Sequence, residues 1–160
     1  MSVMSETRPS SVVTPVVEAA PAHVAERLAT LVLVAVAAAV LFASFRLTPD
    51  HRGYGTHEQL GLKPCTFKVW TGYPCMTCGM TTSFTHMAHF QPLAALRVQP
   101  AGAVLFLMTL AFVPFGLRAA FSGRSFVTWL ETSHARWVGV GLLVVLAGSW
   151  IYAAIRFGGA

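Results

Sequence analysis

Three long runs without a charged side chain are the feature that most constrains the fold. They cover residues 28–45, 98–117 and 137–155, and an arginine flanks each run at both ends. At about 1.5 Å of rise per residue, each run is long enough for a helix that crosses the roughly 30 Å hydrocarbon core of a bilayer. The sequence therefore predicts three membrane-spanning helices over these ranges.

The composition excludes an ordinary water-soluble domain. Hydrophobic residues make up 55% of the 160-residue chain and charged residues only 11%, whereas soluble domains carry about 25% charged residues. We expect an all-α integral membrane protein with a single membrane domain over residues 23–160. Residues 1–22 are rich in Ser, Thr, Pro, Val and Ala without an apolar period, and they are predicted to form a flexible tail.

The positive charge fits membrane anchoring better than nucleic-acid binding. The formal net charge is +5, but the basic residues flank the apolar runs and do not gather into one patch. The predicted partner is the lipid bilayer, and no nucleic acid is expected. Five basic residues fall on one predicted side of the membrane and six on the other, so the positive-inside rule gives no orientation.

Residues 63–92 form a cysteine segment without an apolar run long enough to be a further span. Prolines divide this part of the chain into short pieces, and between Pro74 and Pro92 there is room for one helix of about three turns. We expect an interfacial or re-entrant helix over about 76–90. It would present Cys75 and Cys78 at the membrane boundary.

All cysteines of the chain, Cys65, Cys75 and Cys78, lie in this segment, and the last two form a C-x-x-C pair. One interpretation is a redox pair, in which Cys78 resolves a mixed disulfide formed at Cys75. No βαβ pattern of a thioredoxin-like domain surrounds the pair. A structural interpretation also stays open, in which the thiols pack as small apolar groups or form a static disulfide.

A metal site is the third interpretation. Cys75 and Cys78 would bind zinc or another soft ion, with Cys65, His86 or His89 completing the ligand set. Cys78 and His89 would lie about 16 Å apart along a straight helix. A complete site therefore requires either a bend at Gly79 or a loop that brings Cys65 to the pair.

No pattern in the sequence indicates a particular enzyme. The chain has no glycine-rich phosphate loop, no Ser-His-Asp order and no acidic residue inside a predicted span. The leading functional hypothesis is a non-enzymatic membrane component whose cysteine segment orders the loop and docks a membrane protein or a second copy of the chain. The alternative is a thiol–disulfide or metal-handling membrane protein that uses Cys75 and Cys78.

The stretch CTFKVWTGYPCMTCGMTTSF, residues 65–84, resembles the core of the family called domain of unknown function 2752. The residues that carry the pattern are Cys65, Thr71, Gly72, Pro74, Cys75, Cys78, Gly79 and Thr81. The resemblance extends over about residues 63–117. It implies a three-span protein of the bacterial inner (cytoplasmic) membrane with a cysteine-bearing segment, and it implies no particular activity.

The sequence departs from the family pattern at three positions. Thr66 and Met76 stand where prolines often follow the first and second cysteines, and Thr82 stands where an arginine is often found. If that arginine binds an anionic group in relatives, this chain should not bind one in the same manner.

Overall fold

Every regular element in the described part of the chain is helical. The computed structural model describes residues 20–122 and 133–158, and no strand occurs within these ranges. The elements are α1 (Ala20–Arg46), the 3-10 helix η1 (Thr56–Leu60), α2 (Thr66–Thr71), α3 (Met80–Ala88), α4 (Pro92–Val98), α5 (Pro100–Ser122) and α7 (Ser133–Phe157). The predicted all-α class is confirmed. Most of the predicted tail, residues 1–19, lies outside the described residues, and α1 already begins at Ala20.

Three of these helices contain segments long and apolar enough to cross a membrane. The segments are Val24–Arg46, Pro100–Ser122 and Arg136–Phe157, which confirms the three predicted spans. The second span begins two residues later than predicted, because Val98 ends α4 and Gln99 links it to α5. Pro100 suits the first position of a helix, where its missing N–H needs no partner.

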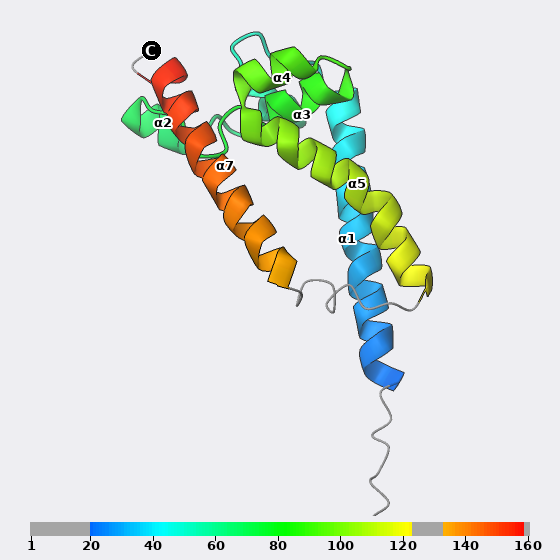
Figure 1. The fold of residues 1–160 in the computed structure, drawn as a ribbon. Helices are drawn as coiled ribbons and strands as arrows, with labels where there is room; N and C mark the ends of the chain where they lie inside the picture. Colours follow the sequence, from blue (N-terminus) through cyan, green and yellow to red (C-terminus); the bar gives the residue numbers. More distant parts are fainter. Residues whose placement is uncertain (1–19, 123–132, 159–160) are drawn as a thin grey trace, which may run out of the picture.

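The short helices gather at one end of the long ones. Figure 1 shows α2, α3 and α4 at the same end as the C-terminal ends of α1 and α7 and the start of α5. The three long helices alternate in direction along the chain. The cysteine segment therefore caps one end of the three spans, and the start of α1 lies at the other end.

Close backbone approach holds the helices together. A Cβ added at Gly116 of α5 would lie 2.6 Å from a methyl carbon of Val34 in α1, so only glycine allows this contact. A Cβ at Gly102 would lie 2.7 Å from the Cβ of Ser83, which seats α3 on the first turn of α5. α7 meets α5 where the backbone N–H of Ala101 donates to Oγ of Ser149 over 3.1 Å.

The long helices expose apolar side chains on their outer faces. Phe115 and Phe121 of α5 are 72% and 81% exposed, and Ile155 of α7 is 80% exposed. Water would disfavour so much exposed apolar surface, whereas lipid chains solvate it. The exposure pattern agrees with an integral membrane protein.

The predicted helix over 76–90 is wrong at its start. α3 covers only Met80–Ala88, and Gly79 before it has a left-handed φ of 84°, which breaks any continuous helix from residue 76. Cys75 and Cys78 therefore lie in the turn that leads into α3. The neighbouring helices η1, α2 and α4 were not predicted, because each is too short to show a clear apolar period.

Candidate metal centre

Cys65 is placed by the start of α2. It occupies the N-cap position of this helix, and its carbonyl accepts the backbone N–H of Val69 over 3.0 Å. The helix ends at Gly72, whose left-handed φ of 73° turns the chain back toward the C-x-x-C pair. Thr71 supports this reversal, since its Oγ1 donates to the carbonyl of Phe67 over 2.7 Å and accepts the N–H of Tyr73 over 3.2 Å.

Cys75 and Cys78 lie on a tight turn. The backbone N–H of Cys78 donates to the carbonyl of Cys75 over 3.0 Å. Gly79 has no Cβ, so the backbone of Gly53 can approach it closely. A Cβ added at position 79 would lie only 3.0 Å from the carbonyl oxygen of Gly53. The turn thus packs tightly against the loop that precedes η1.

Two side chains outside the cysteine segment, one from α7 and one from the residue before the second span, bond to the turn. Nε1 of Trp150 in α7 donates to the carbonyl of Pro74 over 3.2 Å. Nε2 of Gln99, at the junction of α4 and α5, donates to the carbonyl of Met76 over 3.1 Å. These two hydrogen bonds flank Cys75 on both sides, so the position of the pair depends on the positions of the spans.

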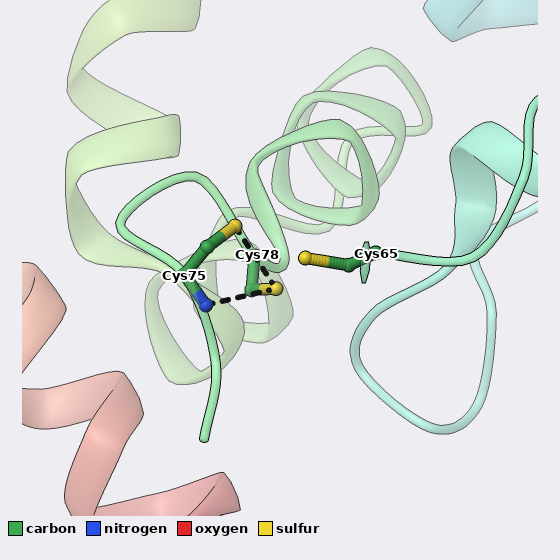
Figure 2. A group of neighbouring side chains, drawn as sticks. All are labelled: Cys65, Cys75 and Cys78. Atoms are coloured by element: carbon green, nitrogen blue, oxygen red, sulfur yellow. Dashed lines mark hydrogen bonds between the residues drawn. The ribbon is translucent and has the colours of Figure 1, made fainter. Parts of the chain in front are cut away.

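The three sulfur atoms converge. Figure 2 shows Cys65 approaching from a separate segment with its sulfur directed toward Cys75 and Cys78. The three Sγ atoms lie within 4.8 Å of one another. Sγ of Cys75 and Sγ of Cys78 are 3.3 Å apart, and the backbone N–H of Cys75 donates to Sγ of Cys78 over 3.3 Å. All three thiols are free, and the loop brings Cys65 to the pair.

This spacing fits one soft metal ion. Three thiolate sulfurs on a tetrahedral zinc ion lie about 3.8 Å apart, as follows from a Zn–S distance of about 2.3 Å. The observed sulfurs need only small shifts to reach that arrangement. Two of them, Cys65 and Cys75, are partly exposed, whereas Cys78 is buried.

The environment shifts the pKa values of the two paired thiols in opposite directions. Burial raises the pKa of Cys75, but hydrogen bonds with Thr77, Cys78 and Cys65 outweigh burial and lower the pKa from 9.0 to about 7. Burial and the hydrogen bond with Cys75 raise the pKa of Cys78 from 9.0 to about 12. Cys75 therefore ionises first, and its thiolate is the first sulfur able to bind a metal or attack a disulfide.

A cavity of about 570 Å³ adjoins the sulfurs, and all three cysteines line it. Two cations, Arg52 and Lys68, also line it, together with the carboxylate of Glu58 and the imidazole of His57. Arg52 is bound to Glu58 over 2.9 Å, and Nζ of Lys68 lies 4.3 Å from the ring centroid of Tyr54. The site is thus reached from a cavity whose largely apolar lining also carries charged side chains.

The structure does not bring the two predicted histidines to the sulfurs. Nδ1 of His86 lies 2.8 Å from Oε1 of Gln91, and Nδ1 of His89 lies 2.8 Å from the carbonyl of Thr85. Neither histidine belongs to the sulfur cluster or lines the cavity. His57 lines the cavity instead, and no local signal marks it in the sequence because it stands in a polar loop without ligand spacing.

The motif residues support the site without forming it. Pro74 is fully buried beside Trp150, and Thr81 lines the cavity. A buried pair of threonine hydroxyls was not predicted from the sequence. In this pair, Oγ1 of Thr56 and Oγ1 of Thr82 lie 2.8 Å apart. Thr82 is fully buried in this pair, and it also lines the cavity.

Comparison with known proteins gives a match to one family model and no activity. No curated protein and no solved structure matches this chain. Residues 65–113, which contain all three cysteines, α3, α4 and the first part of α5, match the family model described as "Protein of unknown function (DUF2752)", and this confirms the resemblance predicted from the cysteine segment.

Proposed function

We propose that this chain is a membrane protein that binds a soft or borderline metal ion, of the zinc(II) or copper(I) class, through Cys65, Cys75 and Cys78. The observation that carries the proposal is the convergence of Cys65 on the C-x-x-C pair within 4.8 Å. A redox pair needs only two thiols, whereas three thiolates are a ligand set for a soft ion.

The basic surroundings support the same proposal. Three thiolates around a divalent ion leave one net negative charge, and Lys68 and Arg52 line the adjoining cavity. Binding would require the thiols to lose their protons, including the buried Cys78. The ion would then replace the hydrogen bonds between the sulfurs and fix the cysteine segment on the end of the spans.

Thiol–disulfide exchange is a second candidate, favoured by the lowered pKa of Cys75 and its 3.3 Å distance to the sulfur of Cys78. In this mechanism the Cys75 thiolate attacks a substrate disulfide, and Cys78 then displaces the substrate thiol, so two electrons pass to the substrate. Docking of a partner protein on the cysteine segment stays a prediction.

Substitution of Cys65 separates the two candidates. Metal content of the detergent-purified protein is measured by mass spectrometry for the wild type, Cys65→Ser, Cys78→Ser and the neighbouring control Thr66→Ala. The metal proposal expects one ion per chain in the wild type and in Thr66→Ala, and loss of the ion in both cysteine variants. If Cys65→Ser has the same metal content as the wild type, and Cys75 and Cys78 exchange with an added disulfide, the redox function is correct and the metal function is wrong.

The membrane concerned is proposed to be the bacterial inner membrane. Three apolar α-helices support this proposal, because spanning proteins of the outer membrane are β-barrels. Fractionation of bacterial membranes tests it, with the chain expected among inner-membrane proteins.

A further inference from the structure

We infer that the three-thiolate site keeps one coordination position open toward the adjoining cavity and that this position accepts a thiolate from outside the chain. The inference rests on the proposed metal-binding function and names the ligand class that the same site exchanges with. Structural zinc sites are closed by four protein ligands, whereas sites that act on a further molecule keep a position free. An open position would make the ion transferable or reactive.

The described residues supply three ligand atoms and no fourth to the cluster. Among residues 20–122 and 133–158, the sulfurs of the three cysteines form the whole group that could hold one ion. All three line the cavity, so the remaining side of the ion would face it. A ligand that enters the cavity therefore reaches the ion directly.

The histidine and the carboxylate that line the cavity are the candidates for a fourth protein ligand, and both are held elsewhere. Nε2 of His57 lies 3.3 Å from the carbonyl of Lys63. Oε2 of Glu58 accepts a hydrogen bond from Arg52 over 2.9 Å, and Arg52 also binds Asp50 over 2.7 Å. Closing the site with either side chain would break these contacts.

The cavity is built for an anionic ligand larger than water. Its volume of about 570 Å³ far exceeds the roughly 30 Å³ that one water molecule occupies in the liquid. Arg52 in its lining is paired with Asp50 and Glu58, and Lys68 is the lining cation that makes no ion pair with a carboxylate among the described residues. A thiolate satisfies both requirements, since it is anionic and it is the donor that soft ions prefer.

The binding step balances without any redox partner. The incoming thiol releases its proton to solvent, its sulfur donates an electron pair to the ion, and a water ligand leaves. No electron is transferred, and no bond within the protein breaks. The thiol belongs either to a small molecule or to a cysteine of another protein, and the experiment separates these sources.

The test uses full-length protein in detergent, loaded with one equivalent of cobalt(II), whose absorption spectrum reports the number and kind of ligands. Glutathione is titrated in one arm, and a peptide with a single cysteine in the other. The matched controls are S-methylglutathione and the same peptide with serine. We expect a saturable spectral change with a thiol probe, no change with its control, and cobalt retained after desalting. A response to glutathione alone indicates a small thiol, and a response to the peptide alone indicates a protein cysteine.

The failures of the two proposals are distinguishable. If thiols leave the cobalt spectrum unchanged and His57→Ala alters it, the site is closed by His57, and the inference is overturned while the metal function stands. If the protein retains no cobalt or zinc at all, the metal function itself is wrong.

A charge variant tests the choice of ligand. Lys68→Gln is expected to weaken thiol binding by about two- to fivefold, as the loss of one partly screened charge interaction predicts. Lys63→Gln removes an exposed lysine that does not line the cavity and should have no effect. Equal thiol affinity in both variants would contradict the assignment of an anionic ligand.

Discussion

Trp150 donates a hydrogen bond from its indole nitrogen to the carbonyl of Pro74, 3.2 Å away and one residue before Cys75. This bond joins α7 to the cysteine segment across 76 positions of sequence. Near the C-terminal end of the same helix, Nζ of Lys68 in α2 donates to the carbonyl of Phe157 over 3.1 Å. α7 is therefore bonded to the cysteine segment at two positions along its length, and a shift of this helix would displace the sulfurs.

Trp150→Phe is the first test of that coupling. The substitution keeps most of the ring but removes the N–H, so the Pro74 carbonyl loses a hydrogen bond worth about 1 kcal/mol. We expect about fivefold weaker zinc binding in a chelator competition. Trp137→Phe, at a 70% exposed position of the same helix, should bind zinc like the wild type, and equal weakening in both variants would contradict the coupling.

Gln99→Met removes the other hydrogen bond to the turn. Gln99 is fully buried, and its Nε2 is the donor to the carbonyl of Met76. Losing this hydrogen bond should lower the free energy of unfolding by about 1 kcal/mol. Thermal unfolding in detergent measures the loss, and the control is Gln91→Met, which breaks only the exposed contact between Gln91 and His86. An unchanged melting temperature for Gln99→Met would show that the bond does not stabilise the fold.

Close helix contacts predict opposite outcomes for two groups of glycines. Alanine at Gly102 or Gly116 would bring a Cβ within 2.7 Å or 2.6 Å of a neighbouring side chain, and we expect a loss of about 1–3 kcal/mol from overpacking. At Gly139 and Gly141 of α7, an added Cβ would meet no neighbouring atom within 4 Å, so alanine there should be neutral or slightly stabilising. Unfolding in detergent compares the four variants.

The same α7 glycines test the predicted homo-oligomer. If a second copy packs closely on this helix, Gly141→Leu should shift the chain toward monomer in detergent, because small residues permit close contact between membrane helices. Mass measurement of the detergent complex reports the shift. A monomeric wild type would contradict the homo-oligomer directly.

The pKa difference predicts the pH dependence of thiol reactivity in metal-free protein. Cys75 has its pKa lowered from 9.0 to about 7, so its alkylation rate by iodoacetamide should rise with a midpoint near pH 7. Cys78, with its pKa raised to about 12, should stay unreactive through pH 9. Mass spectrometry of peptides gives each rate separately, and equal rates at the two cysteines would contradict the assigned environments.

The same shift has a defined sign for stability. Since the folded pKa of Cys75 lies below the unfolded value of 9.0, its thiolate stabilises the fold above pH 9, and this contribution is lost as the pH falls through about 7. Cys78 acts in the opposite direction: its stabilising contribution is complete below pH 9 and is lost as the pH rises toward about 12.

Thr77→Ala should move the midpoint of Cys75 alkylation to a higher pH, because it removes a hydrogen bond that lowers the pKa of Cys75.

The spans could be predicted well from the sequence, and the site only in part. Long uncharged runs fix membrane helices because lipid leaves few alternatives for the backbone. The start of α3 is not predictable from a short apolar period, because Gly79 with its left-handed φ ends the preceding turn. The sequence permits either a bend at Gly79 or a loop that brings Cys65 to the pair, and in the structure the sulfur of Cys65 lies within 4.8 Å of the other two. Gln99 and Trp150 carry no local signal, because each bonds a partner 23 or 76 positions away in sequence. His57 carries none because it stands in a polar loop without ligand spacing.

Membrane topology gives the last prediction. The alternating directions of α1, α5 and α7 place the cysteines and the C-terminus on one side and the start of α1 on the other (Figure 1). Reporter fusions at the two termini should therefore give opposite results. A membrane-impermeant maleimide should label Cys65 and Cys75 only from the side that holds the C-terminus, since these thiols are partly exposed. Labelling from the N-terminal side would contradict the three-span arrangement. The result also fixes the compartment of the thiols, because free thiols persist in a reducing compartment and disulfides in an oxidising one.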